Sequence, residues 1–171
     1  DEAQRVLGSE KDGWGGPLSV FLRQAVDARV AGKPVHIINV RDLHDPTDPY
    51  QQPELLRHGS HNIIGQPGAS FVAPVSEIFA DTDVQNVDVT SLSIPIMTLR
   101  AAVLKATGID LLSHEAALSR IVFAVVGTHS NIRIYNTANT LRNELACPNV
   151  VTCPHLAASP LAEAHRLTFG Q

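Results

Sequence analysis

Asp42, His44 and His61 are the residues of this chain whose types and spacing best suit metal chemistry. Asp42 and His44 stand two positions apart, just after the run 35–40, which is rich in β-branched residues, and Arg41. Side chains at i and i+2 of an extended segment point the same way. His61 follows after a loop of 16 residues. Two imidazoles and one carboxylate suit zinc, iron or manganese, with positions left open for water or substrate. The pattern is also compatible with an Asp42 that caps a turn and with histidines that lie on a hydrated loop. His58, three residues before His61, is either a surrogate ligand or, as we favour, a loop residue.

A second candidate site is the segment 127–133, between an apolar run and an amphipathic stretch. Backbone N–H groups at the start of a helix attract anions and oxyanions, which makes Thr128 and His129 candidate anion-binding residues. Arg133 adds a fixed positive charge and a two-pronged grip on a carboxylate. The alternative is that Ser130 or Asn131 simply caps the helix. The adjacent pair of His129 and Ser130 is a poor candidate for a base and its nucleophile.

The composition is that of a globular chain. Of the 171 residues, 44% are hydrophobic and 18% charged, which excludes a disordered or fibrous protein. A formal charge of −4 without a basic block disfavours nucleic acid as a partner, and no apolar run approaches the roughly 20 residues of a membrane helix. The two cysteines, Cys147 and Cys153, indicate a reducing compartment rather than a disulfide framework. We therefore expect a cytoplasmic protein without a nucleic-acid or membrane partner.

The elements that must position these residues alternate between apolar strands and amphipathic helices. We expect strands at 35–40, 87–89, 121–126 and 149–152, and helices at 18–30, 98–107, 134–145 and from Ser159 through Leu167. This alternation predicts an α/β fold, a doubly wound (Rossmann-like) three-layer sandwich with a central parallel sheet. Ligands of such folds bind at the carboxyl ends of the strands. The candidate site segments are therefore 41–44, 127–133 and 153–159.

Two stretches fit the alternation less well. Residues 41–68 hold no period, and we expect them to be irregular, which in a compact domain is typical of a functional segment. The opening Asp1-Glu-Ala-Gln4 leads straight into a glycine-rich loop, with no apolar strand before it. Either a first strand lies upstream of residue 1, or the sheet is smaller than usual. We expect residues 1–171 to form a single domain whose first strand lies upstream.

In their order, spacing and strand–helix context, these segments resemble the isochorismatase-like (cysteine hydrolase) superfamily, and nicotinamidases in particular. Members carry Asp-x-His after a strand and then His-Cys-x-x-Gly-Thr-x-Gly-Ala, which corresponds here to the segment from His61 to Ala69. They later carry Gly-x-x-Thr-x-x-Cys-Val-x-x-Thr-Ala, which corresponds to the segment from Gly127 to Ala138. The resemblance implies the isochorismatase-like hydrolase fold over nearly the whole chain, and association into a homo-oligomer.

The resemblance also implies a catalytic triad of Asp, Lys and Cys, which this chain carries only in part. Arg133 stands at the nucleophile position, and a guanidinium that stays protonated cannot attack a carbonyl. The position of the lysine falls within 90–93, where the chain has none. Asp1 corresponds to the catalytic Asp if one residue is inserted after it. The nicotinamidase metal ligands, by contrast, correspond to Asp42, His44 and His61.

Two functions are compatible with this combination. The first is a hydrolase of a small molecule, in which a divalent metal activates water or polarises a carbonyl and Arg133 anchors an anionic substrate or oxyanion. The second is a catalytically inactive superfamily member, a ligand-binding or assembly subunit in which Arg133 fills the former pocket. In both we expect Arg133 to pair with Asp1, Asp42 or a bound anion. Ether hydrolysis of the isochorismatase kind is disfavoured by the missing lysine. The resemblance further implies a cis peptide bond at Thr128–His129.

Overall fold

The computed structural model of the chain describes residues 2–80, 83–91, 93–112, 115–159 and 166. Its strands are β1 (Ile38–Asp42), β2 (Gln85–Val89), β3 (Phe123–Thr128) and β4 (Val150–Ala158). The α-helices in this part of the chain are α1 (Glu2–Leu7), α2 (Pro17–Val30), α3 (Gln52–His58), α4 (Val75–Phe79), α5 (Ile96–Thr107), α6 (Glu115–Leu118) and α7 (Tyr135–Asn139). Tight 3-10 turns form η1 (Glu10–Asp12) and η2 (Pro67–Ala69), and wider π-helical turns on either side of α7 form η3 (Ser130–Ile134) and η4 (Thr140–Glu144).

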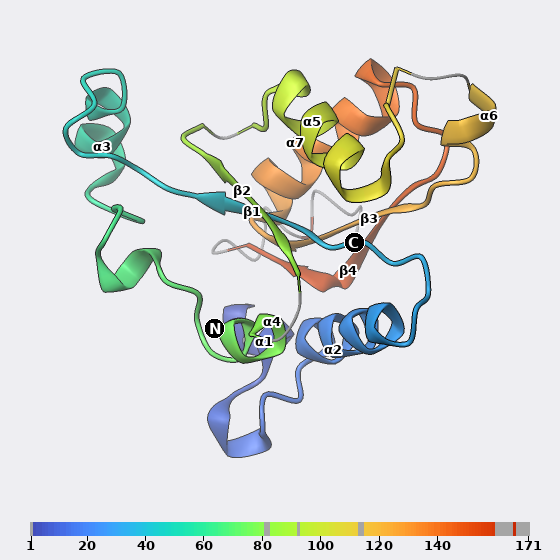
Figure 1. Cartoon of the computed structure of the whole chain (residues 1–171). Helices are drawn as coiled ribbons and strands as arrows, with labels where there is room; N and C mark the ends of the chain where they lie inside the picture. The colour runs from blue at the N-terminus through green and yellow to red at the C-terminus, as the bar shows by residue number, and fades with distance from the viewer. Residues whose placement is uncertain (1, 81–82, 92, 113–114, 160–165, 167–171) are drawn as a thin grey trace.

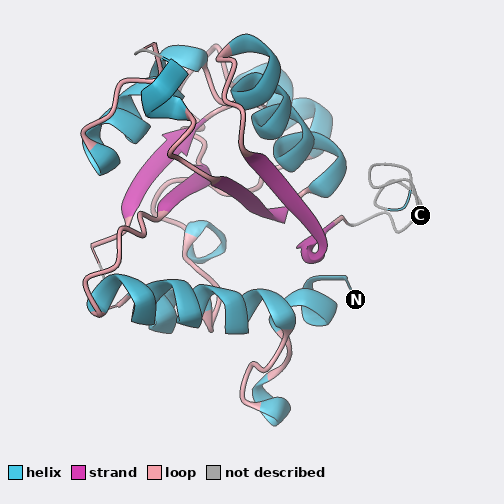
Figure 2. Ribbon diagram, turned by 90° about the vertical axis from the view of Figure 1, so that its right-hand side faces the viewer, coloured by secondary structure: helices cyan, strands magenta, loops and turns pink. Residues whose placement is uncertain are grey.

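The strands are parallel and lie in a layer between two layers of helices (Figures 1 and 2). β1 pairs with β2 along its whole length, and Asp42 stands opposite Val89 at the carboxyl end. β3 pairs with β4, with a shift of register between Val125 and Gly127. The long helix α2 covers one face of the layer, while α5 and α7 cover the other (Figure 1). This is the predicted doubly wound α/β sandwich, with hydrogen bonds that link the strands as two parallel pairs.

Two apolar clusters fill the spaces between the layers. The larger one packs α5 and the η4 turn against the strands, and its buried members are Val87, Val89, Ile94, Leu99, Ala102, Val103, Leu111, Leu118, Leu141, Leu145 and Cys147. The smaller one joins α1 and α2 to β4 through Val6, Leu18 and Ala158. Truncating one large side chain in such a cluster costs about 2–5 kcal/mol. The clusters therefore fix the carboxyl ends of β1 and β3, from which the candidate site residues extend.

The predicted helices are largely confirmed. α2 begins with Pro17 in its first turn, where a missing N–H costs nothing. α5 ends at Gly108, which has the left-handed backbone conformation (φ 73°) that glycine adopts without strain. The helix predicted at 134–145 begins four residues earlier, at Ser130, because η3, α7 and η4 follow one another without a break.

The strands β1 and β3 end two residues later than predicted. Before β1, the N–H of Val35 bonds the carbonyl of Lys33 at 2.7 Å, and this turn delays entry into the sheet to Ile38. β3 likewise ends at Thr128 rather than at residue 126. Asp42 and Thr128, which we expected in loops after the strands, are therefore the last residues of the strands themselves.

The strand β4 corrects the prediction for segment 153–159. We expected a strand at 149–152 followed by a loop, but β4 continues to Ala158. The reason is the length of its partner, because β3 runs on to Thr128 and places Gly127 opposite Ala157 after the register shift. Most of this candidate site segment is therefore part of the sheet.

Two helices lie where we expected irregular structure. α3 interrupts the segment 41–68, and it begins after a turn in which the N–H of Gln51 bonds the carbonyl of Asp48 at 3.1 Å. α1 occupies the opening segment, and the complete burial of Val6 gives that helix its place. The helix predicted from Ser159 through Leu167 falls outside the described residues, apart from Ser159 and Arg166. None of the described helices is long and apolar enough to span a membrane.

Candidate functional site

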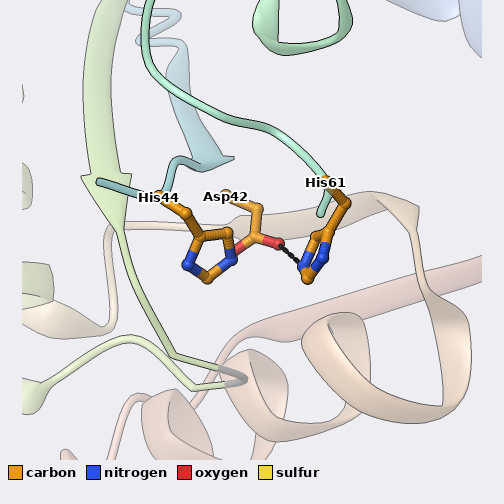
Figure 3. Close-up of side chains that lie close together, drawn as sticks. All are labelled: Asp42, His44 and His61. Carbon is orange, nitrogen blue, oxygen red and sulfur yellow. Dashed lines mark ion pairs between the residues drawn. The ribbon is translucent and has the colours of Figure 1, made fainter. Parts of the chain in front are cut away.

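Asp42, His44 and His61 converge at the carboxyl end of β1 (Figure 3). Nε2 of His44 lies 3.3 Å from Oδ1 of Asp42, and Nε2 of His61 lies 3.5 Å from Oδ2. The two rings meet edge to face with their centroids 4.6 Å apart, and one ligand atom from each residue lies within 4.8 Å of the others. The His44 side chain is fully buried, whereas that of His61 is 33% exposed. The cluster is therefore accessible from the His61 side.

A short parallel bridge between two loop segments holds this geometry. The N–H of His44 donates to the carbonyl of Asn62 at 2.9 Å, and the N–H of Ile64 donates to the carbonyl of His44 at 2.9 Å. His61 is thereby brought beside the segment that continues β1. The side-chain amide of Asn62, a residue with φ 46°, donates to Oδ2 of Asp42 at 3.2 Å. The carboxylate is thus held from the same loop that supplies the second histidine.

Hydrogen bonds at Nδ1 fix which ring atoms face Asp42. Nδ1 of His61 lies 2.8 Å from the carbonyl oxygen of Gly59, which can only accept. Nδ1 of His44 lies 3.3 Å from Oε1 of Gln51, whose amide nitrogen is engaged elsewhere. Both Nδ1 atoms are placed to donate, so that a neutral ring at either position would turn its Nε2 lone pair toward the carboxylate. Nε2 of His44 is buried and has no hydrogen-bond partner within the described part of the chain.

This donor set fits a divalent metal. Two imidazole nitrogens and a carboxylate oxygen are ligands of zinc, iron and manganese, and hydrogen bonds from the distal ring nitrogens of such histidines are typical of metal sites. With neither a cation nor a proton between them, the two lone pairs would face the negative oxygens of Asp42 in a largely buried place, which costs free energy. The orphaned Nε2 of His44 is therefore the atom that points most directly to a bound cation.

Arg133 completes the surroundings of Asp42. It lies in η3, and its Nη2 donates to Oδ1 of Asp42 at 2.5 Å. The two side chains are only 15% and 18% exposed, so this ion pair is mostly buried. Nη1 of Arg133 is also buried, but it has no hydrogen-bond partner among the residues that the structure describes. Of the two carboxylates expected to pair with Arg133, Asp42 does so, and Asp1 lies outside the described residues.

The remaining predicted anion-binding residues lie where β3 meets η3. The peptide bond Thr128–His129 is cis, as the resemblance implies. The side chains of Thr128 and His129 both reach the surface. Partial burial of the His129 ring lowers its pKa, the positive charge of Arg133 lowers the pKa further, and Asp42 opposes both by raising it. His129 therefore stays neutral to lower pH than a free histidine and adds no second positive charge beside Arg133.

The triad implied by the resemblance is not assembled from the described residues. At the position of the lysine, Oγ of Ser91 donates to the carbonyl of Ser93 at 2.6 Å. The chain's lysines are Lys11, Lys33 and Lys105. Lys105 lies in α5, in a shallow hollow that it shares with Gln85 at the start of β2, away from the carboxyl end of that strand. The described part of the site therefore combines the metal-type cluster with a guanidinium where the resemblance puts the thiol, and the segment 90–93 holds no lysine.

Sequence reasoning missed the residues that support the site. Gln51 orients His44, and Asn62 holds Asp42. Oδ1 of Asn131 accepts a hydrogen bond of 3.0 Å from the buried Oγ of Ser159, which joins η3 to the end of β4. Asn62 is adjacent to a candidate ligand, and Asn131 and Ser159 lie within the candidate site segments, so the sequence did point to their neighbourhood. Single amides in polar loops are common, and nothing in the spacing distinguishes Gln51.

Comparisons with known proteins agree with this fold. No family profile and no curated protein sequence matches the chain. Among solved structures, a nicotinamidase/pyrazinamidase from Bacillus subtilis is 18% identical with a TM-score of 0.63, over 90% of this chain and 78% of that one. An isochorismatase family protein from Desulfovibrio vulgaris is 18% identical with a TM-score of 0.62, over 99% and 83%. A pyrazinamidase/nicotinamidase from Streptococcus mutans is 19% identical with a TM-score of 0.60, over 91% and 82%. The chain has the isochorismatase-like hydrolase fold.

Proposed function

We propose that this chain is a metal-assisted hydrolase of a small molecule that works without a cysteine nucleophile. The observation that carries the proposal is the convergence of Nε2 of His44 and Nε2 of His61 on the two oxygens of Asp42, while both Nδ1 atoms lie beside hydrogen-bond acceptors. A divalent metal held there would activate a water molecule or polarise a carbonyl. The structural neighbours include proteins named as nicotinamidases, so we infer a small amide or a related carbonyl compound as the substrate class.

The chain's own residues have distinct roles in this proposal. Asp42, His44 and His61 would hold the metal, and the partly exposed side of His61 leaves room for water and substrate. Arg133 keeps Oδ1 of Asp42 in place and contributes positive charge for an oxyanion. His129, neutral at neutral pH because of its lowered pKa, is available to accept a proton.

Metal content and turnover test this proposal together. The purified protein should take up one equivalent of zinc, manganese or iron and hydrolyse a member of a panel of small amides and esters, and chelation should abolish both properties. His61→Ala should remove metal and turnover. The matched control is His58→Ala, because His58 is exposed at the end of α3 and lies outside the cluster. Failure to take up a stoichiometric metal, or turnover that survives chelation, would contradict the proposal.

A second candidate function is ligand binding without catalysis. It is favoured by the ion pair of Arg133 with Asp42, which places a guanidinium where the resemblance puts the nucleophile, and by the absence of lysine from 90–93. In that case the metal-loaded protein would bind small molecules of the same panel without converting any of them. Saturable binding with unchanged ligand after prolonged incubation would therefore favour this function over the first.

A further inference from the structure

The grip of Arg133 on Asp42 is incomplete. In the surface pair of Arg100 and Asp110, Nε and Nη2 bond both carboxylate oxygens at 2.6 and 2.5 Å. Arg133 reaches only Oδ1 of Asp42, through Nη2, and Oδ2 accepts from Asn62. Nη1 of Arg133 is left buried, with no acceptor from the described residues. The guanidinium therefore bonds its protein partner through Nη2, while the N–H groups of Nη1 still need an acceptor.

The acceptor that best suits Nη1 of Arg133 is a carboxylate. A guanidinium N–H removed from water needs a hydrogen-bond acceptor, and the planar guanidinium matches carboxylate geometry best. Charge favours an anion as well. Arg133 and Asp42 cancel, and a divalent cation, whose imidazole ligands must be neutral, would leave the site with a charge of about +2. A carboxylate next to Nη1 would offset this charge and satisfy the donor at once.

We propose that the ligand of this site carries a carboxylate, which accepts a hydrogen bond from Nη1 of Arg133. The proposal rests on the proposed function for the place of the ligand and for the positive charge that a bound metal would add. Recognition by the guanidinium does not itself require the metal. Arg133 thereby distinguishes acids from their neutral amides, and the substrate would present its carboxylate to Arg133 while another bond of the same molecule is cleaved.

Acetate and acetamide test this recognition, because they have nearly the same size and differ in charge. Binding is measured by titration of the isotopically labelled protein, with the side-chain N–H signals of its arginines as the readout, with and without Zn²⁺. We expect acetate to bind at least about tenfold more tightly than acetamide and to shift the signal of Arg133. Arg133→Met should abolish the preference, and Arg133→Lys should retain part of it. Arg100→Met, the matched control on the surface pair, should leave the preference unchanged.

Two outcomes would overturn the proposal. One is equal binding of acetate and acetamide by the unmodified protein, and the other is a preference for acetate that survives Arg133→Met. If Arg133→Met does not fold, the unmodified protein and Arg133→Lys still decide, because an unshifted Arg133 signal on addition of acetate overturns it equally. The proposed function, metal-assisted hydrolysis, can be contradicted without contradicting carboxylate recognition. An acetate preference that depends on Arg133, in a protein that takes up no metal, supports carboxylate recognition and contradicts metal-assisted hydrolysis.

Discussion

Arg100–Asp110 and Arg133–Asp42 are both arginine–aspartate pairs, but they differ in what each partner leaves unsatisfied. Arg100 in α5 reaches Asp110, ten residues further on, and uses both carboxylate oxygens, while the N–H of Leu112 donates to Oδ1 of Asp110 at 3.0 Å. Arg133 and Asp42 are 91 residues apart and mostly buried, and Nη1 of Arg133 has no partner in the described part of the chain.

The difference shows how one chemical pair serves two purposes. The surface pair closes the end of α5 onto the turn that follows, and its side chains are 27% and 31% exposed. The buried pair joins the carboxyl end of β1 to η3, and it shares its carboxylate with Asn62 and two histidines. Free donors and lone pairs at a buried place cost stability, and proteins retain such costs chiefly where a ligand removes them.

The largest difference should appear when each carboxylate is neutralised. Asp42→Asn leaves a mostly buried guanidinium without its counter-charge, and we expect a loss of about 2 kcal/mol, below the range for fully buried pairs because both side chains keep some exposure. Asp110→Asn should cost clearly less, since water solvates the surface pair. Urea denaturation of both variants, with unchanged m-values, measures this contrast. Equal losses would mean that the buried pair is no more important to the fold than the surface pair.

A second test concerns the affinity of the site for metal. Arg133→Met removes a positive charge that is hydrogen-bonded to the carboxylate ligand, so Zn²⁺ should bind roughly tenfold more tightly, an effect of the size that Coulomb's law gives for nearby charges in a partly hydrated place. Arg100→Met should leave the Zn²⁺ affinity unchanged. Isothermal titration calorimetry of the two variants and the unmodified protein provides the values. Weaker binding in Arg133→Met would show that the guanidinium positions Asp42 for the metal rather than competing with it.

Much of the fold could be predicted from the sequence, because the patterns that mark its helices lie within short segments. The apolar period of α2 and the glycine that ends α5 are set within a few residues, and both elements lie where they were predicted. The ends of the strands depend on the partner strand instead. β4 extends through Cys153 to Ala158 only because β3 continues beside it, and no local pattern records that pairing.

The site shows the same division. Asp42 and His44 were predicted from a spacing of two at a strand end, which is a local property of extended backbone. His61 was predicted as a third ligand from its residue type and its place after the loop, and the resemblance supports the same set. That Asp42, rather than another carboxylate, meets Arg133 depends on how two distant segments pack, and the sequence left several partners open. The support of His44 by Gln51 depends on the conformation of a loop and was not predictable.

Next to the buried pair, we expect His129 to cause a smaller effect, a dependence of stability on pH. An unfolded histidine has a pKa of about 6.5, and in the folded chain burial and Arg133 lower the pKa of His129 below that value. The unfolded state therefore binds more protons between the two pKa values, and the free energy of unfolding falls as pH drops through this window. His129→Gln should lose less stability than the unmodified protein between about pH 8 and about pH 5.5. Parallel pH profiles would show that His129 is not the group responsible.

The smallest effect belongs to the surface pair. The hydrogen bonds from Arg100, and then the N–H of Leu112, lower the pKa of Asp110 to about 2. Because this folded pKa lies below the unfolded value, the carboxylate stabilises the fold above about pH 4, and the contribution is lost as pH falls toward 2. Arg100→Met should raise the pKa of Asp110 toward its ordinary value, whereas Arg133→Met should not change it. Titration of the Asp110 carboxyl carbon by NMR separates the two variants. A pKa that stays near 2 in Arg100→Met would assign the lowered pKa of Asp110 to the N–H of Leu112. The ion pair with Arg100 would then make no contribution to acid stability.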